Sequence, residues 1–191
     1  VHEALGQPLL HALRSEQDPT ITKYANTLKR WTGRETASVV YDSKVCPFTD
    51  ECLFQMIKGK PNIAIVSLTM DGDVFGGFYS IAMSKYGWYK DPNIFVFSFG
   101  SVWRYSAPRK FSVKDNLKAN ANMWCTRNEK EGFVMFGVEG AGCFYLGNEK
   151  SRSFCHGLSD GFEGIDDAGL VQVDDFYPYF SYKRLIAIQM S

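Results

Sequence analysis

The sequence predicts an α+β protein that is mainly β: an antiparallel two-sheet β-sandwich with peripheral helices. Apolar runs of strand length recur from residue 62 to residue 190, with glycine and aspartate turns between several of them. Fifteen phenylalanines and ten tyrosines favour a β-rich interior. The strands do not alternate regularly with helices of about a dozen residues, which disfavours a parallel, doubly wound sheet.

The first segment, residues 1–33, is predicted to be largely helical. Asp18 and Pro19 form a good helix start, because aspartate caps the N-terminus and proline fits the first turn. Apolar residues then recur at the spacing of one buried helix face, and Gly33 can end the helix. We expect this segment to pack on the sheet or lead into it, and residues 34–191 to form the β-sandwich domain.

A second, shorter helix is predicted after Thr49. Asp50 and Glu51 follow it, and acidic residues in a first turn are stabilised by the helix dipole. Apolar residues continue to Ile57, and Gly59 marks the end of the helix.

The segment 61–79, PNIAIVSLTMDGDVFGGFY, is the most informative part of the chain. A β-branched strand leads into an Asp71-Gly72 turn of the kind that closes hairpins, and an apolar strand returns. Gly76 and Gly77 interrupt that second strand. Paired glycines in a strand indicate that a backbone or a bulky ring packs directly against them. We therefore predict that the return strand is central and covered on both faces.

Together with the two strands of this hairpin, at 62–69 and 74–82, strands are predicted at 94–99, 109–113, 133–138, 142–146 and 182–190. The glycine-rich segment 137–142 is predicted to be a hairpin turn and not a phosphate-binding loop, since no helix follows it and the glycine order is wrong. The polar segment 114–131 and the acidic segment 158–175 are predicted to be long loops.

Three segments of the chain resemble the TLDc domain, a module of eukaryotic oxidation-resistance proteins. Residues 61–78 are similar to its pattern of a proline, an apolar run and G-x-V-F-G-G-F/Y; residues 91–99 resemble its D-x-x-x-F-L-F-S-L strand; residues 38–43 resemble its L-L-Y-S-S strand. The likeness spans roughly residues 31–190, and it is closer in the first half. The motif residues that carry it are Gly72, Gly76, Gly77, Phe78 and Asp91.

The TLDc resemblance implies a function. TLDc proteins are associated with protection against oxidative stress, several bind and regulate the vacuolar proton-pumping ATPase, and no enzymatic reaction is generally accepted for the domain. The resemblance therefore implies a non-catalytic protein-interaction module. The predicted final strand, residues 182–190, lacks the Glu-Val-Trp found in many members. This chain therefore departs from the family in a segment that could affect contact with the ATPase.

The search for catalytic, metal and cofactor chemistry is negative at the level of sequence. His156 follows Cys155, but adjacent strand residues point to opposite faces of a sheet. The three histidines and five cysteines show no zinc-binding spacing, and the acidic residues 160–167 do not follow the order of a calcium-binding loop. We expect no catalytic residue, no metal and no cofactor.

Two alternative functions stay open. Basic and aromatic residues interleave between positions 103 and 118, a pattern that can bind single-stranded nucleic acid, although the formal net charge is zero. The residues of this candidate patch are Trp103, Arg104, Tyr105, Arg109 and Lys110.

The second alternative is a redox-active thiol protein. Five cysteines without paired spacing are typical of free thiols in a reducing compartment. Cys46 is the candidate redox residue, because Lys44 lies near it and can lower the pKa of its thiol. No apolar run reaches the roughly 20 residues that span a bilayer. The expected location is the cytoplasm, including the surface of vesicle membranes, or the nucleus.

Overall fold

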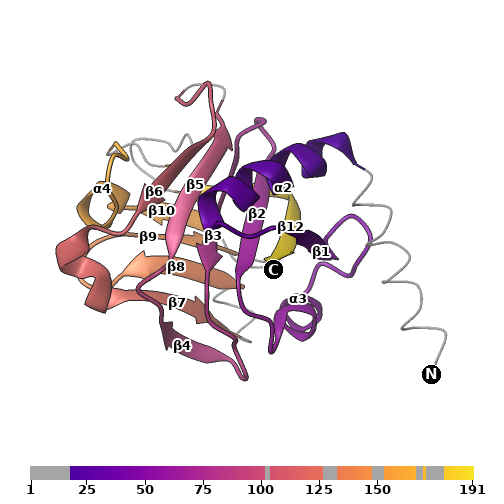
Figure 1. Cartoon of the computed structure of the whole chain (residues 1–191), viewed down its shortest axis with the longest axis horizontal. Helices are drawn as coiled ribbons and strands as arrows, with labels where there is room; N and C mark the ends of the chain where they lie inside the picture. Colours follow the sequence, from indigo (N-terminus) through magenta and orange to yellow (C-terminus); the bar gives the residue numbers. More distant parts are fainter. Residues whose placement is uncertain (1–17, 102–103, 127–132, 148–152, 167–169, 171–178) are drawn as a thin grey trace.

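The computed structural model describes residues 18–101, 104–126, 133–147, 153–166, 170 and 179–191, and the structural statements below concern these residues (Figure 1). Two antiparallel six-stranded sheets face each other, with a few short helices at the periphery. The predicted fold class, an α+β two-sheet antiparallel β-sandwich, is confirmed.

Each sheet is assembled from strands distant in sequence. In the first sheet the order is β1 (Ala37–Asp42), β12 (Tyr182–Met190), β2 (Ile63–Thr69), β3 (Val74–Tyr79), β5 (Phe95–Gly100) and β6 (Arg109–Ser112). In the second sheet the order is β11 (Tyr179–Phe180), β10 (Ser153–His156), β9 (Cys143–Leu146), β8 (Val134–Val138), β7 (Ala121–Cys125) and β4 (Gly87–Lys90). Neighbouring strands pair antiparallel throughout.

The β2–β3 hairpin forms as the sequence predicts, and β3 lies inside the first sheet between β2 and β5. Gly72 takes a φ of 99° in its turn, a conformation that favours glycine. A Cβ on Gly76 would lie 1.9 Å from the Ile65 carbonyl oxygen, and one on Gly77 would lie 2.6 Å from the Phe136 ring. Both faces of β3 are therefore covered at contact distance, as predicted.

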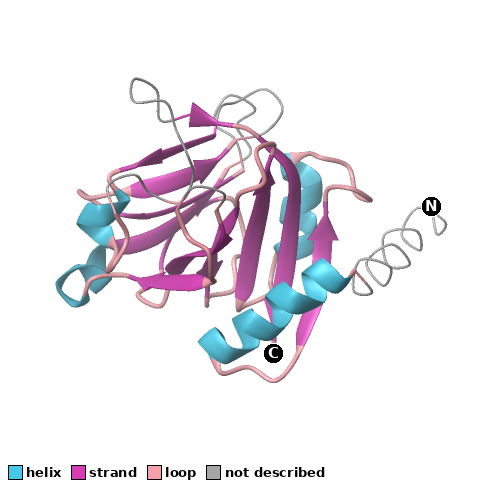
Figure 2. Ribbon diagram, turned by 90° about the horizontal axis from the view of Figure 1, so that it is seen from above, coloured by secondary structure: helices cyan, strands magenta, loops and turns pink. Residues whose placement is uncertain are grey.

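The first sheet buries both of its faces. On β2, Ile63 and Ile65 face the second sheet, whereas Ala64 and Val66 face the helix α2 (Pro19–Thr32). Figure 2 shows α2 lying across this outer face. The Tyr24 ring of the helix stacks on the Phe99 ring with centroids 4.4 Å apart, and the Trp31 ring stacks on Phe99 at 5.6 Å.

The remaining helices are short. They are α3 (Asp50–Ile57), the 3₁₀ helix η1 (Asp115–Asn120) and α4 (Leu158–Gly161). The Thr49 side chain caps α3 by accepting a hydrogen bond from the Cys52 amide, in agreement with the predicted helix start. Residues 1–17 lie outside the described part of the chain, so the division at residue 33 stays a prediction.

An ion-pair network with a buried guanidinium ties α2, β1 and β12 together. Arg184 is 5% exposed and donates to both carboxylate oxygens of Asp42, at 3.0 and 2.6 Å, and to Asp18 at 3.1 Å. Burial alone lowers the pKa of this guanidinium, but the bonds to the two carboxylates outweigh burial and raise it. This two-bond contact between Asp42 of β1 and Arg184 of β12 helps to fix the register of these two strands.

The structure differs from the sequence-based prediction at several elements, and β4, β10 and β11 were not among the predicted strands. The predicted strand 74–82 ends at Tyr79, because the Ser80 amide donates to the Asp91 carboxylate and not to a neighbouring strand. The segment 114–131, predicted to be a loop, contains η1 and β7. Alternate residues of β7 enter the core, but polar neighbours obscure this pattern in the sequence. The loop predicted over 158–175 likewise begins with α4.

Replacement of Gly77 by alanine tests the close approach of the two sheets. The added Cβ overlaps the Phe136 ring, which is fully buried and has little room to move, so we expect a loss of about 1–3 kcal/mol in the free energy of unfolding. Gly100→Ala on the neighbouring strand is the control, since its Cβ would have no atom closer than 3.9 Å. Chemical denaturation measures the free energy of unfolding of both variants. Equal values for Gly77→Ala and Gly100→Ala would contradict the close packing of Phe136 on Gly77.

Replacement of Arg184 by methionine tests the buried network. The change leaves the Asp42 carboxylate, 1% exposed, without its cation, and we expect a loss of about 3–5 kcal/mol in the free energy of unfolding. Lys183→Met, at the exposed neighbouring position, should change it by less than about 0.5 kcal/mol. Similar denaturation midpoints for the two variants would contradict a structural role for the pair.

Candidate functional site

The glycine motif is part of the hydrophobic core. Gly76 and Gly77 face Phe97 and Phe136, and the Phe78 ring stacks on Phe95 at 4.8 Å on the helix-covered face. These motif residues therefore position the two sheets relative to each other.

The last motif residue, Asp91, joins the two sheets. Its fully buried carboxylate accepts hydrogen bonds from the Ser80 amide at 2.5 Å, from the Ser80 hydroxyl at 2.8 Å and from the Asn93 amide at 3.0 Å. Its own amide donates to the Ala121 carbonyl at 3.1 Å. Asp91 thus links the end of β3 to the start of β7.

The candidate basic-aromatic patch is divided among several structural contacts. Tyr105 is 5% exposed, and Arg109 stacks on its ring at 5.2 Å. The ammonium of Lys110 lies 4.4 Å from the Phe95 ring and donates to the Trp31 carbonyl at 3.2 Å, near the C-terminus of α2. Burial lowers the pKa of Lys110. Trp103 lies outside the described residues.

Arg104, the remaining patch residue, belongs to a different contact. Its guanidinium lies 3.9 Å from the carboxylate of Asp166, in the acidic segment that follows α4. The described residues of the candidate patch thus make separate contacts: Arg104 with Asp166, Arg109 with Tyr105, and Lys110 with Trp31 and Phe95.

The candidate redox residue Cys46 is buried, with 8% of its surface exposed, between β1 and α3. The thiol of Cys52 is its neighbour, and burial together with Cys46 raises the pKa of Cys52. Burial also raises the pKa values of Cys125 and Cys155 to about 12.

Residues singled out for metal or nucleophile chemistry lie apart. Cys155 points into the core and His156 is exposed on the opposite face of β10, as predicted for adjacent strand residues. Within the described ranges, no group of three His, Cys, Asp or Glu side chains could hold a metal ion. Among the described helices, none combines the length and apolar character needed to cross a membrane.

The outer face of the second sheet carries a feature that the sequence analysis missed. Cross-strand pairing aligns one residue from every strand into a single line, which we call the aromatic row. In sheet order its members are Trp88, Trp124, Met135, Tyr145, Phe154 and Tyr179.

Ring stacking runs along the aromatic row. The Trp88 and Trp124 centroids lie 5.3 Å apart with a 15° angle between planes, Trp124 and Tyr145 lie 6.0 Å apart, and Tyr145 and Phe154 lie 5.0 Å apart. Trp88 at one end is 61% exposed and Tyr179 at the other end is 42% exposed. Aromatic rings exposed and held in place by their neighbours are a feature of binding surfaces.

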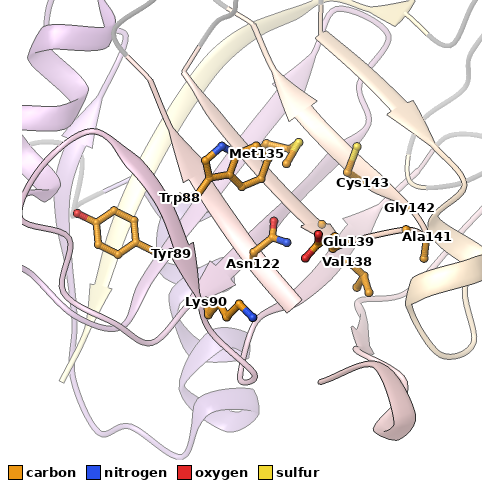
Figure 3. Close-up of a pocket in the computed structure, with 12 residues that line it drawn as sticks. Trp88, Tyr89, Lys90, Asn122, Met135, Val138, Glu139, Ala141, Gly142 and Cys143 are labelled. Atoms are coloured by element: carbon orange, nitrogen blue, oxygen red, sulfur yellow. The ribbon is translucent and has the colours of Figure 1, made fainter. Parts of the chain in front are cut away.

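A groove of about 600 Å³ lies beside the Trp88 end of this row. Its floor includes the next line of cross-strand partners, Lys90, Asn122, Gly137 and Cys143. Figure 3 shows the Trp88 indole beside Met135, with the Asn122 amide and the Glu139 carboxylate lying nearby.

Glycines shape the groove. Gly137 places no side chain on the floor, and a Cβ there would lie 2.7 Å from the Cys143 Cβ. The turn between β8 and β9 forms one wall of the groove. This turn is the hairpin turn predicted from the sequence at 137–142. Gly140 in this turn has a φ of 78°. A Cβ on Gly142 would lie 1.9 Å from the Gly157 carbonyl oxygen, so the turn is held against the start of α4.

The aromatic row depends on the pairing of β4 with β7, whose residues are more than thirty positions apart in the chain. Alternation within residues 121–125 and the short GWYK segment at 87–90 are the sequence signals that could have indicated it. Neither signal reveals which residues become neighbours.

Comparison with known proteins gives no family assignment: the chain matches no protein-family model and no curated protein.

Thiol labelling tests the burial of Cys125 and Cys155. At pH 8 both thiols should stay protonated and unmodified by iodoacetamide in the folded protein, and react only in denaturant. Burial of the two protonated thiols raises their pKa values above the ordinary 9.0. The stability of the folded state is therefore unaffected by their ionisation below pH 9, and it declines as the pH rises toward 12, because the thiols ionise first in the unfolded chain. Peptide mass spectrometry identifies the modified sites, and alkylation of either residue in the folded state would contradict the assignment.

Proposed function

We propose that this protein is a non-catalytic interaction module that binds a partner protein through the outer face of the second sheet. The observation that carries the proposal is the aromatic row, with Trp88 exposed at the edge strand β4. Tryptophan and tyrosine are enriched among the residues that contribute most to protein–protein binding. Stacking on Trp124 restricts the Trp88 ring before binding, which reduces the entropy lost on association.

Charge and contact geometry support a protein partner over nucleic acid. The chain has formal net charge zero, whereas nucleic-acid binding depends on neutralising phosphates with several cations. Lys110 and Arg109 of the candidate basic patch are engaged with Trp31 and Tyr105. The aromatic row, in contrast, exposes Trp88 and Tyr179 at its two ends, on the edge strands β4 and β11, while Tyr145 between them is buried.

The carboxylates and guanidinium that could suggest catalysis have structural partners. Asp91 links the end of β3 to the start of β7, and Asp42 binds Arg184, so these buried polar groups are used within the fold. This arrangement supports a binding function in preference to an enzymatic one.

The identity of the partner is proposed from the TLDc resemblance. An antiparallel two-sheet fold is what that resemblance implies, and the motif glycines Gly76 and Gly77 occupy positions where no larger residue fits without a shift. On this basis we propose the vacuolar proton-pumping ATPase as the partner, and a cytoplasmic role in the response to oxidative stress or in regulation of the pump.

An affinity capture with the vacuolar proton ATPase tests the proposal. The wild-type chain should retain ATPase subunits at high salt, and Trp88→Ala should reduce capture at least about tenfold, as expected for loss of an exposed tryptophan that contacts the partner. Met70→Ala is the control, because Met70 is 64% exposed and lies outside the aromatic row.

Each alternative result has a distinct meaning. Equal capture by the Trp88 and Met70 variants would place the interface elsewhere. Recovery of nucleic acid alone, at low salt only, would overturn the proposal in favour of the residues around 104–118.

A further inference from the structure

We infer that the groove beside Trp88 is a binding site for an uncharged sugar ring of a glycan. This inference goes beyond the proposed protein partner, because it depends only on the groove and not on what the rest of the aromatic row binds. Its volume, about 600 Å³, lies within the range of small-molecule sites, roughly 300–1,000 Å³.

The first requirement of such a site is a flat apolar platform. Trp88 is 61% exposed, and its ring stacks on Trp124 at 5.3 Å with planes 15° apart. One face of the indole therefore lies against the protein, and its exposed surface borders the groove. The C–H bonds on one face of a pyranose ring carry partial positive charge, which complements the negative face of an indole.

The second requirement is a set of polar groups around the platform. The Asn122 amide nitrogen donates to the Asn120 carbonyl at 3.1 Å, and the Glu139 backbone amide donates to the same carbonyl at 2.9 Å. These two bonds position Asn122 and the start of the β8–β9 turn against each other. The Oδ1 atom of Asn122 is buried and accepts no hydrogen bond from any residue that the structure describes. Because this oxygen has almost no exposed surface, a ligand hydroxyl would satisfy it once the Asn122 side chain turns toward the groove.

The charges of the groove favour a neutral ligand with many hydroxyl groups. Lys90 supplies a donor and Glu139 supplies an acceptor, and their formal charges cancel. A hydroxyl group both donates and accepts, so a sugar ring can bond to the two side chains together. A nucleotide or another phosphorylated ligand would need more cationic groups than Lys90 among the residues lining the groove.

The shape of the groove separates a sugar from a planar heteroaromatic ring. The wall formed by the β8–β9 turn contains Val138, Gly140, Ala141 and Gly142, not a second exposed ring parallel to Trp88. A flat heteroaromatic ligand gains most when it is sandwiched between two rings, whereas a puckered ring needs one platform and an aliphatic wall.

Titration with neutral oligosaccharides of glucose, mannose, galactose and N-acetylglucosamine tests the inference, with tryptophan fluorescence and calorimetry as readouts. At least one of these series should bind saturably. Trp88→Ala and Asn122→Ala should each weaken that binding at least about tenfold. Met70→Ala, at an exposed position outside both the aromatic row and the groove, is the control and should bind as the wild type does.

Three results would overturn the inference: no saturable binding by any series, unchanged binding by Trp88→Ala, or preferential binding of a mononucleotide. Circular dichroism of each variant separates loss of binding from loss of folding. Sugar binding without capture of the vacuolar ATPase would support the groove and refute the proposed partner, and the reverse result would do the opposite.

Discussion

The contact between the Phe136 ring and the backbone of Gly77 sets the separation of the two sheets, and the rest of the structure depends on it. A Cβ at position 77 would come within 2.6 Å of that ring. Because the ring occupies this space, β8 lies close over the centre of the first sheet, and Phe144 and Met123 complete the same layer. Asp91 fixes the second link between the sheets by bonding at the end of β3 and beside β7.

The exposed site follows from this buried contact through the two-residue period of a strand. When Met123, Phe136 and Phe144 face the core, Trp124, Met135 and Tyr145 must face outward. The antiparallel register then aligns the outward residues across neighbouring strands, about 4.8 Å apart, and adds Trp88 at the edge. The same alternation places Asn122 and Gly137 on the floor of the groove. The binding surface is thus a geometric consequence of core packing.

The sequence predicted the parts of the fold that local chemistry controls. The Asp71-Gly72 turn, the start of α3 at Thr49 and the buried glycines of β3 each have a local signal, and the structure confirms them. It did not predict β4, β7, β10 and β11, which have two to five residues each and therefore a weak pattern in isolation. The aromatic row was missed for the same reason, since it exists only after distant strands pair. The basic-aromatic segment shows the converse: neighbours in sequence such as Arg104 and Lys110 make separate contacts.

Site-specific photo-crosslinking tests most directly whether the outer face of the second sheet is the binding surface. A photo-reactive amino acid in place of Trp88 should crosslink to the vacuolar proton ATPase, and the same group in place of the exposed Met70 should not. Crosslinks from position 70 alone, or equal yields from both positions, would show that the outer face of the second sheet is not the binding surface.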